Sequence, residues 1–346
     1  MAGARSGWTV WLACGPSAHD QETDVALRYA GLVDVPWDVP LIQAPIGPAA
    51  TSELVIAVSA TGALGTLAGS WTDPAVLRDQ IRRIRAATDR PFCVNLVLAF
   101  PQRNRLDVAI EEGVPYVSFS WGIDAGLIRR AQRGGATVLV QVGSTAEALE
   151  AVTAGADIVV AQGIEAGGHV RSTTPLRSLL HDVRRIISRP LIAAGGIGDA
   201  DAVRQAVTDG ADGVACGTAF LAAQEADVHP RYLDRLIDAS ADDTILTGLF
   251  DGGWPDAPHR VLRGSTVTSW LAAGRPGPGA RPGEGDIVAH RAGLPIMRYG
   301  DAQPTKATTG DIDAMAMYAG LSVGSIDGSE SAARIVHRLA LGLGLG

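Results

Sequence analysis

The chain has 346 residues, of which 47% are hydrophobic and 19% charged, so its composition is that of a globular protein with a large core. A formal net charge of −8 and the lack of any basic cluster exclude nucleic acid as the main partner. Three scattered cysteines, no metal-ligand spacing and no apolar run of ~20 residues exclude a disulfide framework, a zinc site and a membrane span, so we expect a cytoplasmic protein without a metal.

Residues 1–35 show no regular pattern and are expected to form an N-terminal extension. From residue 41 onward, short β-branched runs alternate with segments of helical period. The runs expected to be strands are 41–44, 64–66, 92–96, 116–119, 137–142, 158–162, 191–194 and 213–216. Helices are expected between them at 73–87, 125–133, 145–153 and 200–208. About eight such units of ~20 to 30 residues are typical of a closed (β/α)8 TIM barrel, so we predict this α/β fold.

An internal repeat supports the barrel. The sequence AVTAGAD at 151–157 recurs almost unchanged as AVTDGAD at 206–212. In each copy the glycine can take the left-handed conformation that ends a helix, and the following apolar residues then enter a strand. A doubly wound open sheet would give a similar alternation and is the structural alternative.

The pattern changes after the eighth expected strand. Helical signals occur at 230–239, 312–319 and 329–341, and loops rich in Gly and Pro at 252–258 and 274–285. We therefore predict a barrel at 36–224 and a lid or insertion over the barrel mouth at 225–320, where the chain returns to the barrel. A C-terminal helix is expected within 321–346.

Two glycine-rich turns follow neighbouring strands at the barrel end that carries active sites. Gly195 and Gly196 follow the seventh strand, and Gly217 and Thr218 follow the eighth; each pair precedes an expected helix. Glycine lets a phosphate approach bare backbone N–H groups, and helix N-termini attract negative charge. The paired turns therefore predict a phosphate-binding site, whereas a single glycine turn would indicate only a loop.

The sixth strand leads into the run QGIEAGGH at 162–169, in which Gly167 and Gly168 carry His169 into the barrel mouth. An imidazole takes up or releases a proton near neutral pH, so His169 suits the removal of a proton from a carbon acid. The alternative is a structural loop whose histidine only caps a neighbour. Glu165 is equally able to brace this loop or to touch substrate.

Small and amide side chains at other strand ends complete a possible cofactor site. The bare backbone at Ala44, Pro45 and Ile46 can face a flat ring, and the amides of Asn95, Gln141 and Gln162 form a polar arc. The remaining histidines do not cluster and are expected on surfaces without a role: His19, His181, His229, His259, His290 and His337.

Over residues 38–322 the chain resembles a nitronate monooxygenase, the family formerly called 2-nitropropane dioxygenase. The matching runs are Gln43-Ala44-Pro45, SATGALG at 59–65, Asn95-Leu96, QGIEAGGH, Ala194-Gly195-Gly196-Ile197, Gly217-Thr218, Ala314-Met315 and Tyr318-Ala319-Gly320. The resemblance implies a TIM barrel with non-covalent FMN. It would place the phosphate on the two glycine turns, the ribityl chain and ring near the three amides, and the ring face near residues 44–46.

The resemblance also implies the oxidation of alkyl nitronates or nitroalkanes by O2 to a carbonyl compound and nitrite, in a monomer or homodimer. His169 corresponds to the family's catalytic base and is needed for the neutral substrate. Tyr299 and Lys306 fall in a late loop that borders the substrate in some members. The chain departs from the family at Ile46, where methionine is common, and at 48–50, where a glycine-rich turn is usual. These departures affect which substrate is expected, and FMN binding is still expected.

Three other functions are compatible with the sequence. A flavin-dependent enoyl-thioester reductase shares the fold and the EAGGH run, but takes hydride from NAD(P)H. A family member that tailors a specialised metabolite would keep FMN and O2 and change the substrate. A barrel that binds a phosphate ligand without redox chemistry would bind no flavin.

Overall fold

The computed structural model describes residues 37–345, so the predicted N-terminal extension, with His19, lies outside the described residues. The main sheet has eight parallel strands: β1 (Leu41–Gln43), β2 (Gly65–Ala68), β3 (Phe92–Val97), β4 (Tyr116–Ser120), β5 (Thr137–Val142), β6 (Ile158–Gln162), β8 (Leu191–Ala194) and β9 (Gly213–Cys216). The sheet closes through a parallel bridge between Ile42 and Leu64, where the N–H of Gln43 donates to the oxygen of Leu64 at 3.0 Å. The chain is therefore a TIM barrel and not a doubly wound open sheet.

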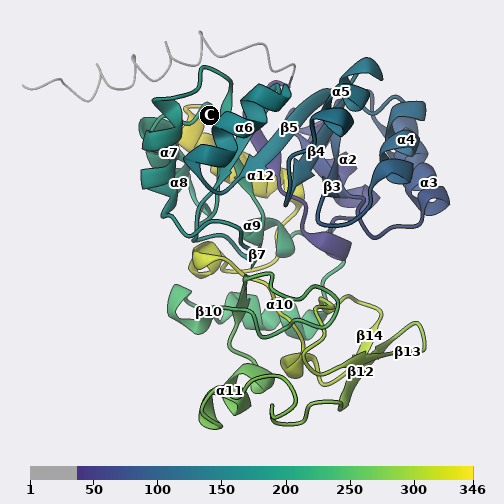
Figure 1. The fold of residues 1–346 in the computed structure, drawn as a ribbon, viewed down its shortest axis with the longest axis vertical. Coiled ribbons are helices and arrows are strands. Elements are labelled where there is room, and N and C mark those ends of the chain that lie inside the picture. Colours follow the sequence, from purple (N-terminus) through teal and green to yellow (C-terminus); the bar gives the residue numbers. More distant parts are fainter. Residues whose placement is uncertain (1–36, 346) are drawn as a thin grey trace, which may run out of the picture. The chain divides into compact units, whose positions relative to one another are not determined.

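Helices alternate with these strands around the barrel (Figure 1): α2 (Ser52–Ala60), α3 (Pro74–Ala87), α4 (Arg103–Glu111), α5 (Ala125–Arg133), α6 (Thr145–Ala154), α7 (Leu176–Arg184) and α8 (Ala200–Thr208). The four helices expected from periodicity are confirmed within one residue at each end. Only one turn of helix, α9 (Thr218–Leu221), follows β9. The C-terminal helix α12 (Ala332–Ala340) packs against α2 and α8 and so takes the place of the eighth barrel helix.

The internal repeat has the same structural role in both copies. Gly155 and Gly210 take positive φ angles of 106° and 103° at the ends of their helices, as the sequence predicts. Two residues after each glycine lies an aspartate: Asp157 accepts a hydrogen bond from the N–H of Val138, and Asp212 accepts one from the N–H of Leu191, both at 2.8 Å. Each aspartate thus ties the start of its strand to the neighbouring strand.

The barrel interior changes from apolar to polar along its axis. Trp37 closes the amino-terminal end and packs edge-on against Tyr116, with ring centroids 5.1 Å apart. Above this layer lie mainly aliphatic side chains, and the carboxyl ends of the strands carry the amides and hydroxyls of Asn95, Ser118 and Gln162. The amino-terminal end is therefore a packed core, and the carboxyl end is left for binding.

The segment inserted after β9 forms its own group of elements (Figure 1): α10 (Pro230–Ile237), β10 (Thr244–Thr247), β11 (His259–Leu262), α11 (Ser265–Ala272), β12 (Ile287–Arg291), β13 (Leu294–Met297) and β14 (Thr308–Gly310). The expected helix at 230–239 is α10. The helix expected at 312–319 is wrong, because only 312–314 form a 3-10 turn. The next residues instead pair with β11 through a bridge between Val261 and Tyr318, so sheet contacts override the local helical pattern.

Backbone pairing joins the insertion to the loop that carries His169. A two-residue strand, β7 (Gly168–His169), pairs antiparallel with β11, with His169 opposite His259 and Gly168 opposite Arg260. The N–H of Leu321 donates to the oxygen of Glu165 at 3.0 Å. The loop after β6 is thus held on both sides by the insertion. Among residues 37–345, no helix is long and apolar enough to cross a membrane.

Candidate active site

A cavity of about 610 Å³ lies at the carboxyl ends of the barrel strands, a volume in the range of cofactor and ligand sites. Its walls include every residue predicted to bind the cofactor, together with the predicted base: Ala44, Pro45, Ile46, Asn95, Gln141, Gln162, Gly167, Gly168, His169, Gly195, Gly196, Gly217 and Thr218. The structure therefore brings these residues together, although they come from the ends of six different barrel strands.

Bare backbone surrounds the side of the cavity formed by the two glycine turns. Gly195 and Gly196 take φ angles of 108° and 71°, which side chains rarely adopt, and a Cβ on Gly195 would lie 3.0 Å from the nitrogen of Ala166. Within the described chain, the N–H groups of Gly195, Gly196 and Gly217 donate no hydrogen bond. The helix α9 has only four residues, so its dipole is small. These free N–H groups would therefore contribute more to the binding of an anion than the dipole of α9.

Small residues keep the opposite turn close to the glycines. A Cβ on Gly217 would lie 3.4 Å from Cγ2 of Ile46 and 3.6 Å from Cβ of Ala44. Thr218 accepts a hydrogen bond from the N–H of Gly320 at 3.0 Å, which fixes its hydroxyl at the same edge. The turn at Gly217 and the backbone at 44–46 thus lie at van der Waals distance and together form one edge of the cavity wall.

The amides of the polar arc differ in how they are engaged. Asn95 donates through Nδ2 to the oxygen of Ser118 at 3.3 Å, which leaves its carbonyl oxygen for a ligand. Gln162 uses both ends of its amide on the next loop: it accepts from the N–H of Arg171 at 3.1 Å and donates to the oxygen of His169 at 3.2 Å. Gln162 therefore braces the loop that carries His169, in addition to lining the cavity.

The imidazole of His169 lies among aromatic rings. It stacks on Trp254 with ring centroids 4.3 Å apart and an interplanar angle of 26°, and Tyr318 lies 5.5 Å away. Its Nε2 is buried without a hydrogen-bond partner among the described residues. Burial, with a smaller contribution from His259, lowers the pKa of His169 to about 3, because a charged ring would lose hydration. His169 is therefore neutral near pH 7 and able to accept a proton.

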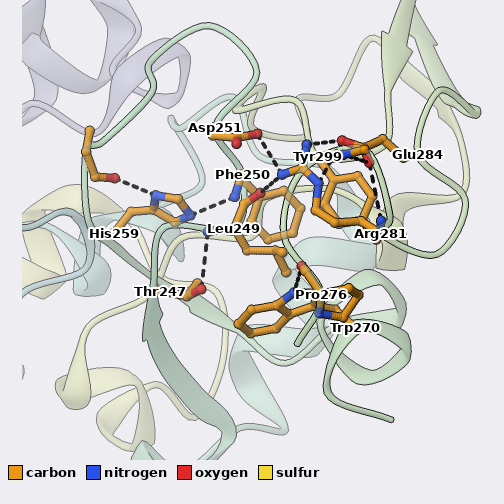
Figure 2. Close-up of polar contacts among 12 residues, drawn as sticks. Thr247, Leu249, Phe250, Asp251, His259, Trp270, Pro276, Arg281, Glu284 and Tyr299 are labelled. Atoms are coloured by element: carbon orange, nitrogen blue, oxygen red, sulfur yellow. Dashed lines mark hydrogen bonds and ion pairs between the residues drawn. The ribbon is translucent and has the colours of Figure 1, made fainter. Parts of the chain in front are cut away.

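His259 is not a surface residue, contrary to the sequence prediction. It is fully buried, and its ring centroid lies 5.3 Å from that of His169. Its Nδ1 lies 2.9 Å from the oxygen of Ala257, and its Nε2 accepts from the N–H of Phe250 at 3.1 Å (Figure 2). These two bonds require the neutral tautomer with the proton on Nδ1, and burial lowers the pKa of His259. Its place opposite His169 comes from the pairing of β11 with β7, which the sequence did not predict.

The other described histidines lie away from the cavity. His181, His290 and His337 are exposed, and His229 is partly exposed and accepts from the N–H of Arg231 at the start of α10. Glu165 also has a structural role, because both of its carboxylate oxygens lie 3.0 Å from the N–H of Leu176. The sequence had left bracing and substrate contact open for Glu165, and the hydrogen bonds favour bracing.

Tyr299 and Lys306 do not line the cavity. The side chain of Tyr299 is buried within the insertion, donates to the oxygen of Pro282 at 2.7 Å and lies under the guanidinium of Arg281, 4.3 Å from its ring centroid (Figure 2). Lys306 is exposed, and its Nζ is 3.5 Å from the oxygen of Gln224. The substrate contact expected for these two residues therefore finds no support in their positions.

Several wall residues were not predicted from the sequence. Trp71, Trp121, Trp254 and Asp301 all line the cavity. Trp121 directly follows β4, so the rule that active-site residues follow barrel strands would have identified it. The same rule applies to Trp71, in the loop after β2, whereas Trp254 and Asp301 lie in the insertion, where the sequence carries no such signal.

Asp301 is a half-buried carboxylate in the cavity wall. No other described residue donates a hydrogen bond to its carboxylate or pairs with it, although Tyr318 donates to its backbone oxygen at 2.8 Å. Burial raises the pKa of Asp301, because the ionised form loses hydration. The cavity thus contains a neutral base and a carboxyl group that is easier to protonate than usual. Cys93 also lines it, but burial raises the pKa of this thiol to about 12, which excludes it as a nucleophile near pH 7.

Comparison with protein families gives a match over most of the chain. A family model described as nitronate monooxygenase matches residues 33–342. The chain is 36% identical over 232 residues to a Mycobacterium tuberculosis protein named (3aS,4S,5R,7aS)-5-hydroxy-7a-methyl-1-oxo-octahydro-1H-indene-4-carboxyl-CoA dehydrogenase. This match covers 66% of the chain and 64% of that relative, so the chain spans slightly less than two thirds of it. A probable nitronate monooxygenase of Bacillus subtilis is 32% identical over 257 residues, covering 62% of this chain and 74% of the relative.

Solved structures with the same fold cover almost the whole chain. FabK from Thermotoga maritima superposes with a TM-score of 0.74 at 28% identity, covering 94% of this chain and 96% of that one. Nitroalkane oxidase from Streptomyces ansochromogenes superposes with a TM-score of 0.72 at 27% identity, covering 89% and 96%.

Proposed function

Since this chain belongs to the nitronate monooxygenase family, we propose that it is a flavin oxidoreductase that binds FMN and oxidises an alkyl nitronate or a nitroalkane. In this reaction O2 is consumed, and a carbonyl compound and nitrite are released. The observation that carries the proposal is the neutral imidazole of His169, stacked on Trp254 inside the cavity that the two glycine turns enclose.

Several residues in the walls of the cavity support the choice of FMN. The free N–H groups of Gly195, Gly196 and Gly217 and the hydroxyl of Thr218 would hold a phosphate. The carbonyl oxygen of Asn95 and the amide of Gln141 would bind the ribityl chain, and residues 44–46 would lie against the ring. When bound, FMN supplies the oxidising chemistry that no side chain here can provide.

His169 is proposed to remove the proton from the carbon next to the nitro group. A free ring with a pKa of about 3 is a weak base. The reaction creates a nitronate anion beside the new imidazolium, however, and their attraction in a buried site raises the proton affinity of the ring as the proton moves. A preformed nitronate needs no base, so His169 should matter for the neutral substrate and much less for the anion.

The test is to purify the yellow protein and follow oxygen uptake and nitrite release with 2-nitropropane and with propyl-2-nitronate. We expect bound FMN, nitrite from both compounds, and no rapid anaerobic bleaching of the flavin by NADPH. Rapid bleaching by NADPH without any reaction of the nitronate would refute the oxidase and favour an enoyl-thioester reductase. A protein that takes up no FMN would refute both.

A second candidate is the oxidation or reduction of the acyl chain of a thioester. It is favoured by the named substrate of the Mycobacterium tuberculosis relative, a carboxyl-CoA compound, and by the fold shared with FabK. The carbon next to a thioester carbonyl is also acidic, so neutral His169 could take its proton in the same place. Anaerobic reduction of the flavin by a saturated acyl-CoA, but not by a nitronate, would favour this candidate.

A further inference from the structure

Three tryptophans line one side of the cavity, and each comes from a different part of the chain. Trp71 lies in the loop after β2, Trp121 directly after β4, and Trp254 in the insertion between β10 and β11. Their rings are in contact: the centroids of Trp121 and Trp254 are 4.7 Å apart, and those of Trp71 and Trp254 are 6.0 Å apart. We call these three residues the aromatic wall.

Packing between the insertion and the barrel explains the position of Trp254 but not that of Trp71. Trp254 is buried and packs with Val97 and Ala257, as expected for a contact between two parts of a fold. Trp71, by contrast, is 56% exposed although it lines the cavity. Trp71 also packs edge-on against Phe100, with ring centroids 5.8 Å apart, but more than half of its indole remains open to solvent and offers apolar area to a ligand.

The backbone at Trp121 gives a second indication. Its φ is +57°, a conformation that is costly for a bulky residue and in which glycine or asparagine is usual. The chain thus carries a strained tryptophan at the carboxyl end of a barrel strand, where active-site residues lie. Arg171 lies over the same ring with its Cζ 6.0 Å from the centroid, and its guanidinium is paired with the carboxylate of Glu147. This part of the wall therefore carries no unpaired positive charge and suits an uncharged ring.

The wall runs from solvent to the reacting imidazole. Trp254 stacks on His169 at 4.3 Å and touches Trp71 at 6.0 Å, so its ring lies between the base and the entrance. A ligand whose acidic carbon lies at His169 can therefore extend along Trp254 and place a ring against the aromatic wall. A nitroalkane of two or three carbons would leave the wall uncovered.

We propose that the aromatic wall is a binding site for a flat ring, so that the substrate is an anionic or neutral carbon acid carrying an aromatic or fused ring. This substrate class rests on the proposed function, since the acidic carbon is placed by the proton transfer to His169. The ring itself makes apolar and edge-to-face contacts and takes no part in the chemistry.

The test measures binding without turnover. The holoenzyme is titrated by calorimetry with 3-phenylpropanoate and with propanoate, whose carboxylate has the shape of a nitronate but cannot release nitrite. We expect the wild type to bind 3-phenylpropanoate at least tenfold more tightly than propanoate. Trp71→Ala should reduce the ratio of the two dissociation constants about fivefold, and Trp71→Phe should keep most of this ratio. Because Trp71 is exposed, its removal should leave the fold intact.

Leu149→Ala is the matched control, since Leu149 is 54% exposed on α6 and does not line the cavity. It should leave the ratio unchanged. A wild-type ratio below threefold, or an unchanged ratio in Trp71→Ala, would overturn the proposal. A tenfold ratio that depends on Trp71 would uphold the ring site even if neither nitronate nor nitroalkane is oxidised, and in that case the proposed oxidation alone would fail.

Discussion

Replacing His169 separates its role as a base from its role in packing. His169→Ala removes both the ring nitrogens and the ring that stacks on Trp254. His169→Phe removes only the nitrogens, because a phenyl ring can occupy the same stacked position. If the imidazole acts as a base, the two variants should lose activity with a neutral nitroalkane to a similar extent and should both keep FMN.

The size of the effect follows from the ionisation of the ring. With a pKa of about 3, only about one His169 ring in 10⁴ is protonated at pH 7, so practically all of the enzyme holds the base form. A positioned general base contributes about 10² to 10⁴ in rate, which corresponds to about 3 to 5 kcal/mol of transition-state stabilisation. We expect a loss of this size in kcat/KM for 2-nitropropane, and less than about tenfold for propyl-2-nitronate.

The assay is initial oxygen uptake with each substrate, measured from pH 5 to pH 8. Because burial lowers the pKa of His169, kcat/KM of the wild type for 2-nitropropane should not fall as the pH drops through 6.5. A wild-type profile that does fall with a pKa near 6.5 would show a solvated imidazole and refute the burial argument. Either variant oxidising 2-nitropropane within about threefold of the wild-type rate would refute His169 as the base.

Three further changes test the rest of the site. Gly196→Ala should lower the flavin content of the purified protein, because a side chain is strained at its φ of 71°; Gly135→Ala, at a φ of 89° with open space around its Cβ, should keep full flavin. His259→Ala should cost about 2 to 4 kcal/mol in urea unfolding, because it leaves a buried donor and a buried acceptor without a partner. Asp301→Asn should raise the Tm at pH 7, since the raised pKa of Asp301 means that its ionised form opposes folding; the gain should shrink toward pH 4, where the carboxyl is protonated, and a loss of Tm at pH 7 would contradict this.

Much of the fold was predictable because it depends on short-range patterns. All eight barrel strands lie within two residues of the expected bounds, since buried parallel strands are short β-branched runs between helices of clear period. The cavity residues were predictable for the same reason: once the strand ends are known, the barrel places the residues that follow them at one mouth. His169, Asn95 and Gly195 could be grouped in this way although they are far apart in the chain.

The inserted segment was not predictable to the same extent. Its strands β10, β12, β13 and β14 are partly exposed and mix polar with apolar residues, so no buried apolar run marks them, and the helical pattern at 312–319 gives way to pairing with β11. His259 was assigned to the surface because its own neighbours in the sequence show nothing of β7, to which it pairs across 90 residues.

By itself, the sequence determined the barrel, the glycine turns and the loop that brings a histidine to the mouth, because each depends on residues close together in the chain. Only the tertiary structure decided what surrounds that histidine: His259 behind it, Trp254 stacked on it, and an exposed Trp71 at the entrance. These contacts join the barrel to the insertion and bury His169. Burial lowers the pKa of its imidazole and so keeps the ring uncharged near neutral pH. The position of His169 is therefore a local property of the chain, and its protonation state and access to a substrate are properties of the folded molecule.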